Sequence, residues 1–199
     1  MSHYLYLVRH GEQENAEHGI NDGPLSERGR AQAHLIGRRL ASVPLSESYT
    51  SPLDRAVETS AVIDQYTSGP AALESTLLFD CIPTGQDGAP PTYDGFFGGI
   101  GDEVVEAGMA QMNDAYDTFF SKSREDRHTL LVTHNFVIGE FVRRALDAPE
   151  WRWLGLNSVN TGLTVVRVRT RKPAELLLFN DRAHLTPELQ TGVNTAIVV

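Results

Sequence analysis

The sequence predicts an α/β fold, a three-layer α/β/α sandwich around a mostly parallel central sheet. Two continuous apolar runs, at residues 4–8 and 129–133, are typical of parallel strands that are buried on both faces. Amphipathic patterns of helical period separate these two runs and follow the second. Strands that alternate with helices over most of a chain form a parallel sheet with helices on both faces.

The first helix is expected to begin after Ser26, because serine is a preferred N-cap and apolar residues follow it at helical spacing. A second helix is expected at Ser51-Pro52, with Ser51 as N-cap and Pro52 as the first helical residue, since proline loses no hydrogen bond there. The remaining expected elements are a strand end at 49–50, helices over 102–121 and 137–146, and closing strands over 163–168 and 176–179.

Residues 81–101 interrupt the alternation of strands and helices. This stretch is rich in Pro, Gly and Asp, keeps no hydrophobic period, and contains Tyr93, Phe96 and Phe97. Loops of this length inside compact domains are commonly functional, so we expect a lid-like loop. Its aromatic residues either form a wall over a pocket or pack the loop itself. With about 150 residues per domain as a prior, residues 1–199 are expected to form a single domain.

The composition excludes several classes of protein. The chain of 199 residues has 17 Lys and Arg against 26 Asp and Glu, a formal net charge of −9. It lacks the basic surface by which proteins bind nucleic acid or anionic membranes, so neither partner is expected. No stretch approaches the roughly 18 apolar residues of a membrane span. The one cysteine, Cys81, cannot form an internal disulfide, which favours a reducing compartment, and we expect a cytoplasmic protein.

A histidine follows each of the two apolar runs: His10 the first and His134 the second. Because ligands of open α/β sheets bind beyond the carboxyl ends of the strands, we expect both histidines to face one crevice. Arg55, on the first turn of the second helix, adds a forked donor for phosphate oxygens near an anion-friendly helix end. Together with Arg9 these side chains would form a cationic pocket in an acidic protein. Such a pocket suits a phosphoryl group.

Three motifs, in chain order, resemble those of the histidine phosphatase superfamily, also called phosphoglycerate-mutase-like. They are Arg-His-Gly at 9–11, Ser-Pro-Leu-Asp-Arg-Ala-Val-Glu-Thr at 51–59, and Val-Thr-His at 132–134. Residues 25–33 are similar to the family's opening helix, so the resemblance covers most of residues 4–180. The stretches 77–83 and 153–162 look most like the branch that contains mitochondrial protein serine/threonine phosphatases.

The resemblance implies a phosphomonoester hydrolase that acts through a covalent phosphohistidine on His10. The catalytic residues would be His10, Asp80 and His134, with Asp80 as the general acid at a position where relatives more often have Glu. Asp87 and Glu103 lie in or beside the same region and are alternative acids. The implied phosphate-binding residues are Arg9, His10, Gly11, Arg55, His134 and Asn135. No metal and no other cofactor is expected.

Two related functions use much of the same site. Mutase-type phosphoryl transfer is disfavoured, because the chain lacks the insertions of the cofactor-dependent mutases and has Gln13 in place of the usual threonine. A non-catalytic protein that only binds a phosphorylated ligand would need the arginines alone, whereas here both histidines and a candidate acid are present. His18, in the loop after His10, is positioned in the sequence to touch substrate.

Other nucleophiles and metals fit the sequence less well. The chain has no closely spaced histidine pair of the kind that binds zinc, and arginines beside both candidate ligands would oppose a dication. To act as a phosphatase nucleophile, Cys81 would need an arginine six residues later, but that residue is Asp87. The expected partner is therefore a phosphorylated small molecule or a phosphoprotein. An apolar cluster is either core or the surface of a homodimer: Trp151, Trp153, Leu154 and Leu156.

Overall fold

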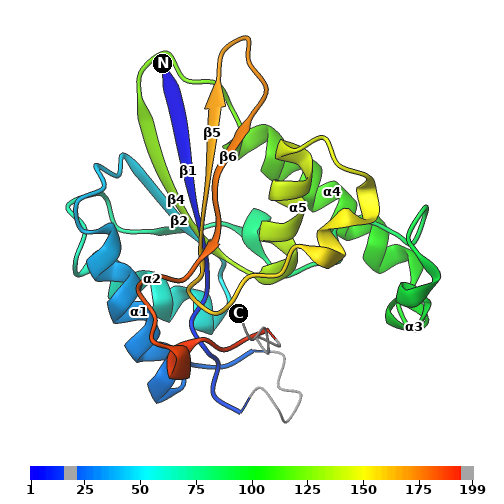
Figure 1. Ribbon diagram of the computed structural model, residues 1–199, viewed down its shortest axis with the longest axis horizontal. Coiled ribbons are helices and arrows are strands. Elements are labelled where there is room, and N and C mark those ends of the chain that lie inside the picture. Colours follow the sequence, from blue (N-terminus) through cyan, green and yellow to red (C-terminus); the bar gives the residue numbers. More distant parts are fainter. Residues whose placement is uncertain (16–21, 194–199) are drawn as a thin grey trace.

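A computed structural model describes residues 1–15 and 22–193 and shows one central sheet (Figure 1). Within these residues the sheet has six strands, in the order β3-β2-β4-β1-β5-β6. Their bounds are β1 Ser2–Arg9, β2 Glu47–Thr50, β3 Leu73–Glu74, β4 Arg127–Thr133, β5 Leu163–Arg169 and β6 Glu175–Asp181. Every neighbouring pair from β3 to β1 is parallel. Strand β5 is antiparallel to both of its neighbours, β1 and β6. The sheet is mixed but mostly parallel, as predicted.

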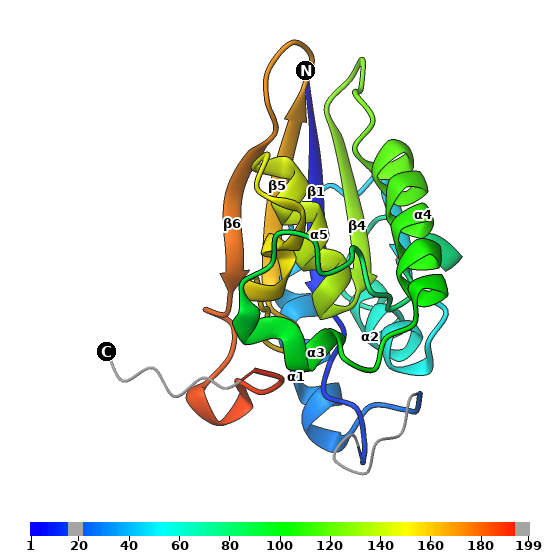
Figure 2. The same cartoon turned by 90° about the vertical axis from the view of Figure 1, so that its right-hand side faces the viewer.

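Helices cover both faces of the sheet, which confirms the three-layer arrangement (Figures 1 and 2). One face packs on α1 (Glu27–Leu40) and α2 (Asp54–Asp64), and the other on α4 (Asp102–Phe119) and α5 (Asn135–Ala145). Strand β1 contributes to the cores on both faces, because successive side chains of a strand point to opposite faces of the sheet. Its Leu5 and Leu7 pack in the core beneath α4 and α5, whereas Val8 packs beneath α1 and α2.

The expected start of the first helix is confirmed, and that of the second is wrong by two residues. The Ser26 hydroxyl accepts a hydrogen bond from the Gly29 N–H at 3.0 Å, so it caps α1 as predicted. Helix α2 begins only at Asp54, and its N-cap residue Leu53 provides no side-chain bond. The Asp54 N–H instead donates to the Asp22 carboxylate at 3.1 Å. The Ser51 hydroxyl accepts a long hydrogen bond from the Leu53 N–H at 3.4 Å and has a second, closer partner that is described below.

The stretch 81–101 is not a bare loop. Phe96 makes edge-to-face contacts with Phe136 and with Trp153, which is fully buried. The Trp153 indole N–H also donates to the Thr84 hydroxyl at 2.7 Å. Aromatic packing therefore orders the stretch, and Trp153 belongs to the core. The short helices here and elsewhere are η2 Thr76–Leu78, η3 Pro91–Tyr93, α3 Asp94–Phe97, η4 Glu150–Gly155 and η5 Pro187–Leu189. Among the described residues, no helix has the length and apolar character needed to cross a bilayer.

Gly108 marks the closest approach of α4 to the segment that leaves β3. A Cβ at this position would overlap the carbonyl oxygen of Ile82, two residues after Asp80. We expect Gly108→Ala to destabilise the protein by about 1–3 kcal/mol, because overpacking outweighs the higher helix propensity of alanine. Urea unfolding measures the difference. Gly95→Ala is the matched control, since nothing lies within 4 Å of its Cβ, and equal stability of the two variants would contradict the expectation.

Candidate active site

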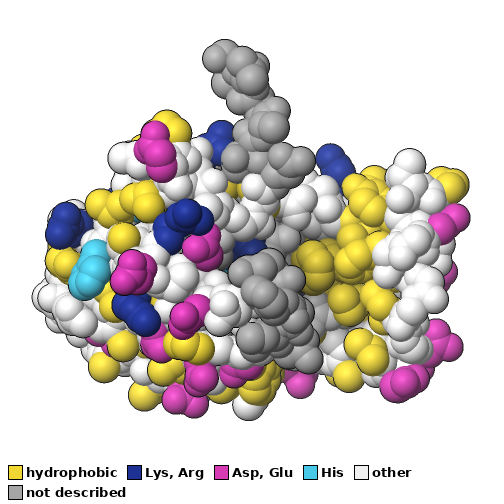
Figure 3. All heavy atoms as spheres, turned by 90° about the horizontal axis from the view of Figure 1, so that it is seen from below, with side chains coloured by type: hydrophobic (Ala, Val, Ile, Leu, Met, Phe, Trp, Pro, Cys, Tyr) yellow, Lys and Arg dark blue, Asp and Glu magenta, His cyan; other side chains and the backbone are white. Residues whose placement is uncertain are grey.

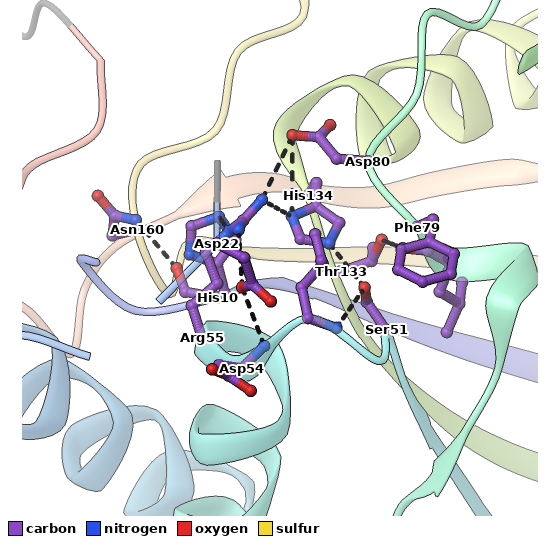
Figure 4. A network of polar contacts seen from close by, with 12 residues as sticks. His10, Asp22, Ser51, Asp54, Arg55, Phe79, Asp80, Thr133, His134 and Asn160 are labelled. Carbon is purple, nitrogen blue, oxygen red and sulfur yellow. Dashed lines mark hydrogen bonds and ion pairs between the residues drawn. The ribbon is translucent and has the colours of Figure 1, made fainter. Parts of the chain in front are cut away.

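The two histidines predicted to share a crevice lie side by side at the carboxyl ends of β1 and β4. Parallel pairing aligns Arg9 with Thr133, so the next residue of each strand leaves the sheet at the same edge. The His10 N–H donates to the Thr133 carbonyl at 2.9 Å, which continues the ladder by one bond. The ring centroids of His10 and His134 are 5.1 Å apart, and both rings are almost entirely buried (Figure 4).

Hydrogen bonds define which nitrogen of His10 carries a proton. Its Nδ1 lies 2.7 Å from the Gly11 carbonyl oxygen, which only accepts, so Nδ1 must donate. Its Nε2 lies 3.2 Å from Nε of Arg55, which only donates, so Nε2 must accept. His10 is therefore neutral, with the lone pair of Nε2 directed into the site. This is the form of imidazole that acts as a nucleophile.

Ser51 fixes the second histidine. The Nδ1 of His134 lies 3.3 Å from Nη2 of Arg55 and accepts a hydrogen bond from it. The ring proton is therefore on Nε2, which donates to the Ser51 hydroxyl at 2.8 Å. Ser51 was predicted to cap a helix because proline loses no hydrogen bond as the first helical residue. The structure gives it a different role, which is to orient His134.

Burial and neighbouring charges keep both rings neutral. Burial is the largest effect on His10 and lowers its pKa well below 6.5, with His134, Arg9 and Arg55 acting in the same direction. The pKa of His134 is likewise lowered well below 6.5, first by burial and then by Arg55 and Arg9. Both imidazoles are thus unprotonated at neutral pH, because the charged form would be desolvated beside two cations.

Arg55 lies at the centre of the site, and 5% of its surface is exposed. Figure 4 shows its guanidinium between Asp80 and the two histidines. Besides its contacts with both rings, it lies 3.6 Å from the Asp80 carboxylate and 3.3 Å from that of Asp22. Burial lowers its pKa and the two carboxylates raise it. A fixed guanidinium between two histidines is a ready donor for the oxygens of a phosphoryl group.

Arg9 supplies the second cation. Its Nη1 donates to the carbonyl oxygens of Ser158 and Gly192, each at 2.7 Å. Its buried Nε has no hydrogen-bond partner within the described residues. Burial lowers the pKa of Arg9 to about 10 while Asp80 opposes the shift, so the group stays cationic at neutral pH. A buried donor without a partner, on a guanidinium held by its other end, fits an anionic ligand.

The segment at residues 189–192, here called the C-terminal strap, holds Arg9 and His10 in place. Gln32, fully buried on α1, donates to the Leu189 carbonyl at 2.7 Å and accepts from the Glu12 N–H at 2.8 Å. Asn160 donates to the His10 carbonyl at 3.0 Å, and its own N–H donates to Thr191. The sequence analysis missed these residues, because no motif links amides so far apart along the chain.

The conformation and surroundings of Gly192 in this strap leave no room for a side chain. Its φ of +90° is rarely adopted by other residues, and a Cβ would overlap Asn160 and lie 2.8 Å from Nη1 of Arg9. The signal available in the sequence was a lone glycine near the described end of the chain. Such a glycine is too common to indicate a contact with an arginine at residue 9.

Asp80 lies at the rim, where the structure brings it to the cluster as predicted. Its carboxylate is 4.0 Å from Nδ1 of His134, and 43% of its side chain is exposed. Desolvation on the pocket side raises its pKa, although Arg55 and Arg9 oppose this rise. Neither alternative acid lines the cavity that contains Arg55 and Asp80 within the described residues, and Asp87 lines a separate one.

Two residues assigned to phosphate binding have other contacts. The Gly11 N–H donates to the Thr59 hydroxyl at 2.9 Å, and its missing side chain permits close contact with Gly29, so the close approach serves packing. The Asn135 amide bonds to Asn157 at one end and to the Ser158 N–H at the other. It therefore supports the loop whose carbonyl holds Arg9, and its side chain does not reach the cluster. His18 lies outside the described residues.

The remaining candidate chemistries find little support in the site. Burial raises the pKa of Cys81 to about 12, so its thiol is protonated at neutral pH and is a poor nucleophile. In the part of the chain that the structure describes, no group of three or more His, Cys, Asp or Glu is arranged to hold a metal ion. The donors that converge on this site are instead those of an anion-binding pocket.

The chain is thus an α/β protein with a pocket lined by histidine and arginine side chains, whose donors suit an anionic group. Residues 5–77 match the family model of the histidine phosphatase superfamily, branch 1. Over these residues, less than half of its length, the chain is similar to this superfamily.

Two curated proteins are similar to this chain along most of its length. The mitochondrial serine/threonine-protein phosphatase PGAM5 of Rattus norvegicus is 29% identical over 192 residues, which span 93% of this chain and 65% of the relative. The Pgam5 of Caenorhabditis briggsae is 28% identical over 94% of this chain and 65% of its own length. The chain thus spans less than two thirds of the length of these curated relatives.

Two solved structures share the fold. YhfR of Bacillus stearothermophilus superposes with a TM-score of 0.74 and 23% identity, over 92% of this chain and 98% of its own. The phosphoserine phosphatase of Entamoeba histolytica gives a TM-score of 0.68 and 22% identity, over 92% of this chain and 100% of its own. At this level of identity the likeness establishes the architecture alone.

The predicted cytoplasmic location is wrong by this comparison, because the curated relatives are named as mitochondrial proteins. Composition could not have shown this. An acidic chain with one cysteine is compatible with more than one reducing compartment.

The lowered histidine pKa values make folding sensitive to acid. In the unfolded chain His10 and His134 return to about 6.5, so below that pH the unfolded state binds protons that the folded state does not. Their contribution to stability is complete above pH 6.5 and is lost as the pH falls, at up to about 1.4 kcal/mol per histidine and pH unit.

Urea unfolding at pH 7 and pH 5 tests this effect. The variant with His10→Gln and His134→Gln should lose less stability on acidification than the unsubstituted protein. Some acid sensitivity will remain, because the pKa values of His3 and His184 are also lowered. An unchanged loss in the double variant would contradict the expectation.

Proposed function

We propose that this protein is a phosphomonoester hydrolase that acts through a covalent phosphohistidine on His10. The observation that carries the proposal is the state of His10: a buried, neutral imidazole whose Nε2 lone pair points into a pocket with Arg9, Arg55 and His134. An anion placed in this pocket meets donors on several sides and a nucleophile on one. That is the arrangement an in-line phosphoryl transfer needs.

In the first step Nε2 of His10 attacks phosphorus, and the bond from phosphorus to the leaving oxygen breaks. Arg9 and Arg55 stabilise the charge on the other phosphoryl oxygens. The protonated carboxyl of Asp80 gives its proton to the leaving oxygen, so an alcohol departs and a phosphohistidine remains. A raised pKa suits Asp80 to this role, because a general acid must hold its proton near neutral pH.

In the second step a water attacks phosphorus on the face that the alcohol has left. The Asp80 carboxylate takes the proton of that water, and the bond from phosphorus to Nε2 breaks. Inorganic phosphate is released, and His10 returns to its neutral form with Nδ1 still bonded to the Gly11 carbonyl. Asp80 ends the cycle protonated, as it began.

Hydrolysis is favoured over the two other functions that this site permits. A protein that only binds a phosphorylated ligand would not need a histidine nucleophile in its reactive tautomer or a carboxyl group beside it. Mutase-type transfer would need a second hydroxyl held at the site. We propose that no metal takes part, that the substrate is a phosphorylated small molecule or a phosphoprotein, and that residues 1–199 act as one domain.

Trapping the intermediate tests the role of His10. Rapid quench with labelled substrate, in the presence of a chelator, should yield a phosphoenzyme that is labile in acid and stable in base. His10→Ala should abolish both the label and the turnover, because the substitution removes the Nε2 that attacks phosphorus. Full activity in His10→Ala, or a rate restored only by added metal, would refute the mechanism.

The leaving group tests the role of Asp80. Asp80→Asn should lower turnover of an alkyl phosphate by about 100- to 10,000-fold, because a poor alkoxide needs a proton to depart. The loss should be much smaller for a nitrophenyl phosphate. Asp87→Asn is the matched control, since Asp87 lies outside the cluster. Equal loss on both substrates in Asp80→Asn would show that Asp80 is not the general acid.

A further inference from the structure

A cavity of about 410 Å³ opens directly beside Asp80 and Arg55. The other residues that line it are all apolar: Leu53, Phe79, Cys81, Ile82, Val104 and Phe136. Figure 3 shows hydrophobic side chains gathered on this face of the molecule, between its middle and the end that carries α3. The hydrolytic steps described above use none of these apolar side chains.

The position of the cavity relates it to the leaving group. In an in-line transfer the leaving oxygen lies opposite the attacking Nε2 of His10. The acid that protonates this oxygen must be within hydrogen-bond reach, so the oxygen lies next to Asp80. Whatever is attached to that oxygen therefore extends into the space beside Asp80. The cavity occupies that space.

The charges around the cavity restrict what enters it. Arg55 is the only cation among the described lining residues, and it already faces Asp22, Asp80 and both histidines. A second anionic group on the substrate, such as a carboxylate or another phosphate, would lie among apolar side chains without a cation of its own. Placing an unpaired charge there is costly.

We propose that this cavity is the subsite for the leaving alcohol, and that the preferred substrates are monoesters whose alcohol carries an uncharged apolar group of about the size of an aromatic ring. The inference rests on the proposed hydrolase function and adds its substrate class. The cavity has the volume usual for a small-molecule site, and apolar walls favour a group that leaves water on binding.

Two esters of primary alcohols test the preference, because their leaving groups are chemically alike. The kcat/KM for 2-phenylethyl phosphate should exceed that for glycerol 3-phosphate by about 10- to 100-fold, from burial of the ring. The value for 3-phosphoglycerate should be lower than both. Equal kcat/KM for the first two esters would overturn the subsite and leave the hydrolase function standing.

A charge at the rim of the cavity should reverse part of this preference. Val104 lies on α4 and is 47% exposed, so Val104→Lys places an ammonium at the rim without disturbing the core. We expect the ratio of phenylethyl to glycerol ester to fall about 10-fold and hydrolysis of 3-phosphoglycerate to rise.

Met109→Lys is the matched control, because Met109 is 38% exposed on the same helix and lines a different cavity. Met109→Lys should keep the ratio of the unsubstituted protein. If Val104→Lys and Met109→Lys change the ratio equally, the subsite is overturned.

Binding separates the two proposals if neither ester is hydrolysed. If, in addition, labelled substrate yields no phosphoenzyme on His10, the hydrolase function is refuted. Calorimetry with non-hydrolysable phosphonates decides the subsite in either case. Tighter binding of 2-phenylethylphosphonate than of methylphosphonate supports an apolar subsite beside the phosphoryl pocket, and equal binding overturns it.

Discussion

The parallel pairing of β1 with β4 is the constraint on which the site depends. Because Arg9 aligns with Thr133, the chain places one histidine after each strand at the same edge, and the bond from the His10 N–H to the Thr133 carbonyl fixes their relative height. A slip of one residue would turn every side chain of one strand to the other face. The apolar cores on both faces of the sheet oppose such a slip, so packing far from the site sets its geometry.

The positive charge of the two buried arginines in this acidic protein is compensated by several neighbouring groups. Two backbone carbonyls hold Arg9, and two carboxylates lie near Arg55. Within the described residues, Arg9 is held by carbonyl oxygens, which carry no full charge, and the charge of Arg55 is shared between two carboxylates. The histidines contribute by remaining neutral, because a further cation in this desolvated space would be unfavourable.

Local patterns predicted the parts of this structure that depend on local chemistry. The continuous apolar runs of β1 and β4, and the capping serine of α1, each express a preference that a short segment carries by itself. Ser51 shows where such reasoning fails, because a hydroxyl before a helix serves equally well as a cap or as a partner for a histidine from another strand. Gln32 and Asn160 were not foreseeable, since their roles arise only when distant segments meet.

The position of β1 also has a consequence for how the protein is made. This strand lies inside the sheet, and both of its neighbours, β4 and β5, come from the second half of the chain. During synthesis β1 therefore leaves the ribosome with both edges unpaired, long before a partner strand exists, and non-local pairing of this kind folds slowly. The carbonyls that hold Arg9 come later still, from residues 158 and 192. A nascent or truncated chain thus contains Arg9 and His10 without a formed pocket, and the candidate site is complete only after residue 192 has been synthesised.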